Sequence, residues 1–480
     1  MPKVKKKPKK SKLSEKLNLK QKNGWDKLSK AKEKMIYSFC DDYKQFLDTA
    51  KTEREAVEEI ISMASKLGFK PIDKVKTVNL GTKLYSLNRN KSIALAIIGS
   101  EPIENGLNII ASHIDAPRLD LKQNPLYENS ESKTALLRTH YYGGIKKYQW
   151  VNIPLALHGK VILASGKELE LSIGEAPDDP IFVIPDLLPH LYRQRQAKRR
   201  LGEGIKGEEL NILVGHRPLE ERGAKSKIKL WVLNYLNKKY GMVEEDFISA
   251  ELEVVPAGKT YDVGFDRSMI AGYGQDDRSC AYTSIRAIFD QKKPKRTAVV
   301  FLFDKEEIGS AGSSSVKSRF LENMVGDLLA LKNKDYRDSL LRKTLQNSQA
   351  LSSDVNGGIN PIFADVHEKQ NAARLGNGIV ITKFTGSGGK SGANDASAEF
   401  MGHIRRLLNK NNIAWQAAEL GKVDEGGGGT VAKFLAEHNM EVVDCGPAVL
   451  SMHSPLEISS KVDIYSCYEA YCAFLTGLKK

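Results

Sequence analysis

Histidine and carboxylate residues follow four short apolar segments of this 480-residue sequence. They are His113 and Asp115 after LNIIAS, Glu306 and Glu307 after AVVFLFDK, Asp354 after ALSS, and His453 after AVLSM. A further pair, Asp276 and Asp277, lies in the glycine-rich turn GYGQDD before a helical segment. Ligands in open α/β sheets bind at the carboxyl ends of strands, so we expect these side chains to meet at one edge of a sheet.

Each of these features has an ordinary structural explanation when it is taken alone. A histidine after a strand is often a surface or core residue, a Glu-Glu pair is usually solvated, and an Asp-Asp pair can cap its helix. Their shared topological position favours a common site over separate coincidences.

Two imidazoles and three carboxylates, one of them from the Asp276–Asp277 pair, form a ligand set for divalent metals. The set suits Zn²⁺, with Co²⁺ or Mn²⁺ as alternatives, rather than Ca²⁺ or an iron–sulfur cluster. A single catalytic zinc usually takes three protein ligands. Five therefore indicate two metal ions about 3.5–4 Å apart with one shared carboxylate, which leaves Glu306 free to act as a base.

The segments that position these residues alternate between strand-like and helical patterns. Apolar strands are expected at residues 92–100, 107–115, 297–310, 350–358, 378–384 and 446–455, and helices at 278–290, 397–409 and 428–438. Strands that are apolar throughout are typical of a sheet covered on both faces, and their alternation with helices predicts an α/β fold. One or two amphipathic helices are expected at 35–66, and a helix near 464–478 is expected to dock on the sheet.

Residues 117–258 follow a different pattern and contain almost none of the candidate site residues. They combine strand-like runs at 160–165, 168–174, 227–233 and 248–255 with a basic helical stretch at 192–200. A single core rarely exceeds about 250–300 residues, so a chain of this length should form two domains. We therefore predict that residues 117–258 are a second domain inserted into the first.

The net charge of +14 is concentrated at the N-terminus. Residues 1–34 contain 14 Lys and three acidic residues, a net charge of +11, which leaves +3 for the rest. We interpret this segment as a solvated, disordered tail, with a salt-sensitive polyanion tether as the alternative, and we predict no specific nucleic-acid site. No apolar run approaches the roughly 20 residues of a membrane span, and five scattered cysteines fit the reduced thiols of a cytoplasmic protein.

The segments SHIDAPRLDLK, QDDRS, DKEEIGSAGSSS, SSDVNGGINP and MHSPLE resemble the M18 family of metallo-aminopeptidases, the aspartyl aminopeptidase and aminopeptidase I group. The resemblance implies a zinc enzyme that removes N-terminal residues from peptide substrates. It implies a mixed-sheet α/β/α catalytic domain of the di-zinc exopeptidase type at residues 35–116 and 259–480. A β-rich dimerisation domain at 117–258 is also implied, with dimers that assemble into a dodecamer.

The resemblance also implies a role for each metal ligand. Asp276 would bridge the two metals. His113 and Asp354 would complete the ligands of one metal, and Glu307 and His453 those of the other.

Three further residues receive roles from the same resemblance. Glu306 would be the general base, and Asp115 would orient the imidazole of His113. His190, in the segment IPDLLPHLYRQ, would reach the active site of a neighbouring subunit, with a helix-surface or interface histidine as the alternative.

Several alternatives stay open from the sequence. Lys383 and Lys390 could bind an acidic N-terminal side chain, although we favour a neutral or broad specificity. The glycine run at 426–429 lacks the Lys-Ser/Thr ending of a P-loop, and we expect a close-approach loop near the site at most. Another di-metal amidase such as a carboxypeptidase or deacylase, a non-catalytic scaffold and a polyanion-binding protein are the competing functions.

Overall fold

The computed structural model describes residues 12–19, 21–333 and 336–477. Its main sheet has nine strands in the order β1-β2-β3-β13-β4-β14-β20-β16-β18. Their bounds, in that order, are Lys70–Pro71, Lys83–Asn88, Ser92–Ile97, Ala298–Phe303, Asn108–His113, Gln349–Ser353, Glu441–Gly446, Ile379–Thr382 and Trp415–Ala417. Strands β13, β4, β14 and β20 run parallel, and β3 and β16 flank them antiparallel. The prediction of a mixed α/β sheet is confirmed.

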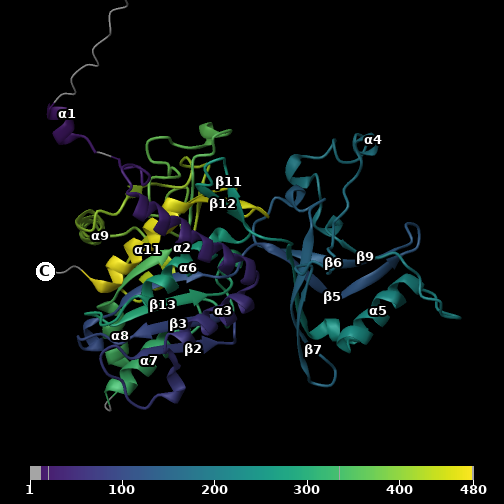
Figure 1. Cartoon of the computed structure of the whole chain (residues 1–480), viewed down its shortest axis with the longest axis horizontal. Coiled ribbons are helices and arrows are strands. Elements are labelled where there is room, and N and C mark those ends of the chain that lie inside the picture. Colours follow the sequence, from purple (N-terminus) through teal and green to yellow (C-terminus); the bar gives the residue numbers. More distant parts are fainter. Residues whose placement is uncertain (1–11, 20, 334–335, 478–480) are drawn as a thin grey trace, which may run out of the picture.

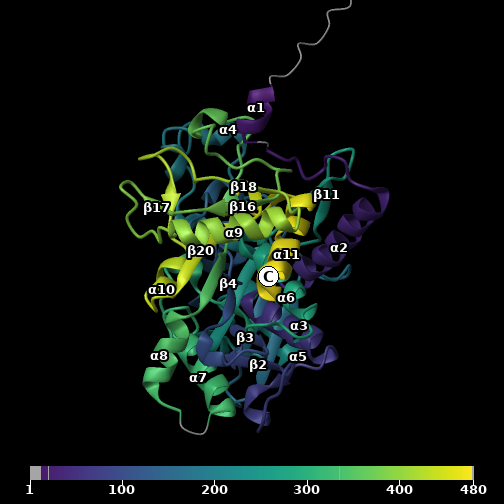
Figure 2. The same cartoon turned by 90° about the vertical axis from the view of Figure 1, so that its left-hand side faces the viewer.

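Helices cover both faces of this sheet, so the unit has three layers (Figure 2). One face carries α2 (Lys30–Thr49), α3 (Glu53–Lys66), α6 (Gln275–Phe289), α9 (Ala398–Lys410) and α11 (Lys461–Thr476). The other carries α7 (Phe320–Lys332), α8 (Asp338–Gln346) and α10 (Ala432–Ala436). Alternate residues of β13 enter the two cores, because successive side chains of a strand point to opposite faces.

A second unit is formed by the chain between β4 and β11 and lies beside the first (Figure 1). It contains a six-stranded sheet in the order β8-β7-β10-β5-β6-β9. Their bounds, in that order, are Glu168–Ile173, Leu155–Ile162, Ala250–Pro256, Arg118–Asn129, Thr134–Tyr142 and Ile212–Gly215. Helix α5 (Lys227–Tyr240) packs on this sheet, and α4 (Pro189–Tyr192) lies at one end of the unit.

Two smaller sheets lie next to the main one. A five-stranded sheet has the order β11-β12-β22-β21-β15, with bounds Tyr261–Val263, Met269–Gly272, Glu457–Ser460, Ala448–Leu450 and Asn356–Gly357. A two-stranded sheet joins β17 (Gly386–Ser387) to β19 (Gly427–Gly428). In the described part of the chain, no helix combines the length and the apolar character needed to cross a membrane.

Three expectations about local structure need correction. Residues 227–233 were expected to be strand-like but begin α5, where they cover a sheet face instead of pairing with it. The basic stretch 192–200 is helical only at its first residue, where α4 ends, and continues as turns. The tail expected at 1–34 also differs. Residues 1–11 lie outside the described residues, α1 (Lys12–Leu17) is helical, and Trp25 and Leu28 pack against the core under α2.

Candidate metal centre

Three neighbouring parallel strands of the main sheet end at the same edge and supply imidazole and carboxylate side chains. His113 is the last residue of β4, and Asp354 comes directly after β14. Glu306 and Glu307 open a single 3-10 turn shortly after β13. Parallel strands point the same way, so their carboxyl ends, and these four residues, lie together.

His453 reaches this edge by a different route from the one expected. It follows β21, which belongs to the five-stranded sheet. The expectation that its strand continues the main sheet is wrong, because β20, which the sequence pattern did not indicate, occupies the place beside β14. The chain leaves the main sheet after β20, and the turn between β21 and β22 carries His453 back to the site.

Asp276 lies between the two histidines. One carboxylate oxygen is 3.2 Å from Nε2 of His113, and the other is 3.3 Å from Nε2 of His453. Nε2 of His453 is also 3.4 Å from a carboxylate oxygen of Glu307. Burial raises the pKa of Asp276, but the two imidazoles outweigh it and hold that pKa below its usual value. This arrangement keeps the central carboxylate ionised between two nitrogen donors.

The neighbouring Asp277 lies on one side of the centre only. Ligand atoms of Asp277, His113 and Asp354 fall within 4.8 Å of one another, as do those of Asp276, His113 and Glu307. Burial and the nearby Asp354 raise the pKa of Asp277 well above its usual value. Asp276 contacts both histidines and Asp277 does not, so Asp276 is the better candidate for a carboxylate shared by the two sides.

The donor set fits divalent cations. Both carboxylate oxygens of Asp277 and Oε1 of Glu307 are buried and have no hydrogen-bond partner among the described residues. Burial raises the pKa values of Glu306, Glu307 and Asp354 above their usual range. Buried carboxylates without partners are costly unless a cation compensates them, and nitrogen with carboxylate oxygen is a zinc-type donor set.

Asp115 connects His113 to the turn that carries Glu306 and Glu307. Its two carboxylate oxygens accept the backbone N–H groups of Glu306 and Glu307 at 3.1 and 3.2 Å. Nδ1 of His113 donates to the backbone carbonyl of Asp115 at 3.1 Å and is 3.4 Å from its carboxylate. These contacts leave Nε2 of His113 free to face Asp276.

Glu457 is a buried carboxylate at the site that the sequence analysis did not single out. Its two oxygens accept the backbone N–H groups of Asp276 at 3.0 Å and of His453 at 2.7 Å. It therefore holds two candidate ligands at a fixed separation. The only sequence signal was its position in the segment MHSPLE, four residues after His453.

A family model described as Aminopeptidase I zinc metalloprotease (M18) matches residues 46–475. The chain belongs to the M18 family. It is therefore a zinc aminopeptidase, a hydrolase that acts on peptide bonds. The resemblance read from the sequence is confirmed.

Similar proteins span almost the whole chain. A probable M18 family aminopeptidase 1 of Borreliella afzelii (strain PKo) is 50% identical over 458 residues, which cover 95% of this chain and 99% of the relative. The crystal structure of an M18 family aminopeptidase from Thermotoga maritima matches with a TM-score of 0.92 and 44% identity over 96% of this chain and 100% of that one. The structure of aminopeptidase I from Clostridium acetobutylicum matches with a TM-score of 0.90 and 46% identity over 96% and 100%.

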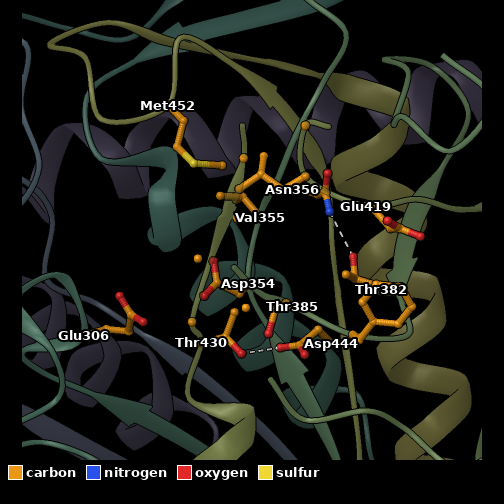
Figure 3. A pocket seen from close by; sticks show the side chains of 18 of the residues that line it. Glu306, Asp354, Val355, Asn356, Thr382, Thr385, Glu419, Thr430, Asp444 and Met452 are labelled. Atoms are coloured by element: carbon orange, nitrogen blue, oxygen red, sulfur yellow. Dashed lines mark hydrogen bonds between the residues drawn. The ribbon is translucent and has the colours of Figure 1, made fainter. Parts of the chain in front are cut away.

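The candidate metal centre of this M18 enzyme opens into a pocket of about 500 Å³ (Figure 3). Val355 and Met452 line the pocket on one side of Asp354 in this view, and the Thr430 hydroxyl donates a hydrogen bond to the Asp444 carboxylate on the other. Residues 426–429 also line it, as a close-approach loop should. A Cβ at Gly427 would meet the carbonyl oxygen of Gly386 at 2.2 Å, so only glycine lets β17 and β19 pair over the pocket.

Two predicted residues have different positions relative to this pocket. Lys390 lines it, but its ammonium group is 2.8 Å from a carboxylate oxygen of Asp395, which Lys383 also contacts. His190 is exposed in α4 of the second unit and is not among the described residues that line the pocket. The structure therefore does not bring His190 to the site of its own chain.

Proposed function

We propose that this M18 aminopeptidase uses two divalent metal ions for catalysis. Zinc is the metal we favour, and cobalt and manganese are the alternatives. His113 and Asp354 hold one ion, Glu307 and His453 hold the other, and Asp276 bridges both. The observation that carries the proposal is the Asp276 carboxylate, which offers one oxygen to each histidine side. Two cations held there polarise the substrate carbonyl and lower the pKa of the attacking water.

Glu306 is the general base of the proposal. Its carboxylate lines the pocket beside the candidate ligands, and burial raises its pKa above the usual value. A carboxylate in this position can accept a proton from water and return it to the departing amine. Asp115 keeps Glu306 in place through the backbone N–H of the turn.

A comparison of free and N-acetylated peptides tests the activity. The positively charged α-amine of a free peptide is attracted by the carboxylates around the metals, and acetylation removes that charge. We expect a leucyl chromogenic substrate to be hydrolysed in the presence of Zn²⁺, Co²⁺ or Mn²⁺ and its N-acetyl copy to be left intact. Equal release of the chromophore from the two would indicate another di-metal amidase, and removal of the acetyl group from the N-acetyl copy alone would indicate a deacylase.

We propose a neutral or broad specificity over an acidic one. Asp395 already pairs with both Lys383 and Lys390, so a substrate carboxylate would have to displace it. The apolar side chains of Val355 and Met452, which line the pocket on one side of Asp354, suit an uncharged N-terminal residue (Figure 3). Leucyl and aspartyl substrates assayed side by side distinguish the two specificities.

Zinc should stabilise the protein more strongly as pH rises from 5 to 8. Burial raises the pKa values of Glu307 and Asp354 in the metal-free protein. Burial lowers the pKa of His453, but the neighbouring carboxylates outweigh it and raise that pKa to about 10. These groups make the folded chain bind more protons than the unfolded chain, so the stability of the metal-free protein falls as pH rises.

The lowered pKa values of Asp115 and Asp276 do not act between pH 5 and 8, because both carboxyls are already ionised there in the folded and the unfolded chain. Metal must displace the bound protons, so its affinity grows with pH, and activity is lost at acidic pH. Thermal unfolding with and without zinc at pH 5, 6, 7 and 8 measures this. A zinc-induced rise in Tm that stays constant or shrinks with pH would contradict it.

We propose that residues 117–258 form a dimerisation domain and that dimers assemble further, up to a dodecamer. Apolar side chains are exposed around α4, where a partner could cover them: Leu187, Leu188, Leu191 and Tyr192. The solved S. cerevisiae mApe1, which shares the fold at 22% identity and a TM-score of 0.73, is a dodecamer. We propose a cytoplasmic location, because the five cysteines are free and four of them are buried.

His190 is expected to act on the site of a neighbouring subunit. Its exposed position at the tip of the second unit is compatible with such a reach, and an imidazole N–H can stabilise the tetrahedral oxyanion by a few kcal/mol.

His190→Ala should bind both metals and assemble, yet lose most of its kcat. Inactive His190→Ala and Glu306→Gln chains, dissociated, mixed and reassembled, should regain partial activity. Mixtures as inactive as either parent would show that His190 does not act in trans.

A further inference from the structure

The turn Tyr142–Gly144 belongs to the second unit but lies against the metal centre of the first. It ends β6 and contacts three different site residues through three consecutive positions. Tyr142 contacts Asp115, Gly143 approaches Glu307, and Gly144 contacts His453. This turn therefore reaches both sides of the proposed metal pair.

Tyr142 completes the hydrogen bonds of Asp115. Its hydroxyl donates to Oδ2 of Asp115 at 2.8 Å, the same oxygen that accepts the N–H of Glu307. The ring is only 7% exposed, and the guanidinium of Arg118 lies 4.0 Å from its centroid. Arg118 is itself fixed by Glu253, 3.1 Å away on β10. The second unit thus holds the hydroxyl in one position, pointing at Asp115.

Gly144 sets the orientation of the second histidine. Its carbonyl accepts the Nδ1–H of His453 at 3.0 Å, which leaves Nε2 to face Asp276 and Glu307. Gly143 has a φ of +75°, and a Cβ there would meet Cβ of Glu307 at 3.4 Å. Glycine at position 143 lets the turn come this close without strain.

We propose that Tyr142 is a positioning residue for metal retention, and that the turn Tyr142–Gly144 makes the metal centre dependent on the second unit. The inference rests on the proposed metal centre. Histidine ligands generally need a partner on their second nitrogen, and loss of such outer contacts costs 10–100-fold in metal affinity or activity. Removal of the Tyr142 hydroxyl leaves Asp115 with fewer donors and loosens both His113 and the Glu306–Glu307 turn.

The test compares Tyr142→Phe with Tyr141→Phe. Tyr141 is the preceding residue of β6, is 42% exposed and lies beside Lys147 at the surface, so it is a matched control for the loss of one hydroxyl. Zinc-loaded proteins are titrated with a chromophoric chelator at fixed pH, and far-UV circular dichroism reports the fold. We expect Tyr142→Phe to bind zinc at least about 10-fold more weakly, with kcat reduced, KM little changed and an unaltered spectrum. Tyr141→Phe should match the wild type.

Four results would overturn the inference. Zinc affinity and kcat of Tyr142→Phe equal to those of the wild type would show that the hydroxyl does not position the centre. An equal loss in Tyr141→Phe, or a loss that appears only with a changed spectrum, would indicate a general structural effect. A wild-type protein that binds no zinc would remove the proposed metal centre, and the inference with it.

Discussion

Glu306→Gln is expected to reduce kcat by about 10²–10⁴-fold while the metal content stays that of the wild type. Glutamine keeps the size and the backbone contact to Asp115 but cannot accept the proton of the attacking water. Metal content is measured by elemental analysis and turnover with a leucyl chromogenic substrate. The matched control is Glu307→Gln at the next position, which alters a proposed ligand and should lower the metal content.

Two outcomes would contradict this assignment. Wild-type turnover in Glu306→Gln would exclude the side chain as the base. Metal loss in Glu306→Gln equal to that of Glu307→Gln would make it a ligand, and the base would have to be sought elsewhere.

Asp276→Ala is expected to lose at least one of the two metals. At an effective dielectric constant of 20, two unit charges 4 Å apart repel by about 4 kcal/mol, and two divalent ions repel more strongly. The carboxylate between His113 and His453 offsets that repulsion for both ions at once. Elemental analysis of the dialysed protein measures the loss, and activity should fall with it.

Asp277→Ala is the matched comparison. Asp277 approaches only the His113 and Asp354 side, whereas Asp276 contacts both histidines. Asp277→Ala should therefore retain more metal than Asp276→Ala. An equal or greater loss from Asp277→Ala would reverse the assignment within the Asp-Asp pair and make Asp277 the bridge.

The sequence predicted the part of the site that depends on strand ends. His113 and Asp354 follow short strands that are apolar throughout, and such strands lie at the centre of a covered parallel sheet. The carboxyl ends of neighbouring parallel strands lie at the same edge of a sheet, and this rule requires no knowledge of long-range contacts. We could therefore predict from the sequence that these residues lie together. The inserted position of the second sheet could be read in the same way, from a change of pattern between residues 117 and 258.

The rest of the site and of the fold depends on contacts between distant parts of the chain, which the sequence does not reveal. Glu457 and Tyr142 are single polar residues that bond Asp276 and Asp115, which lie 181 and 27 residues away, and no local periodicity marks them. The strand before His453 was assigned to the wrong sheet because an apolar run does not reveal its neighbours. Residues 227–233 form a helix because one face packs on a sheet, which outweighs their strand-like composition.

Anomalous diffraction at the zinc absorption edge, from crystals of the zinc-loaded protein, tests the central claim most directly. We expect two anomalous peaks about 3.5–4 Å apart, with the Asp276 carboxylate between them. His113 and Asp354 should lie at one peak and Glu307 and His453 at the other. A single peak, or two peaks that do not share Asp276, would contradict the two-metal site proposed for this enzyme.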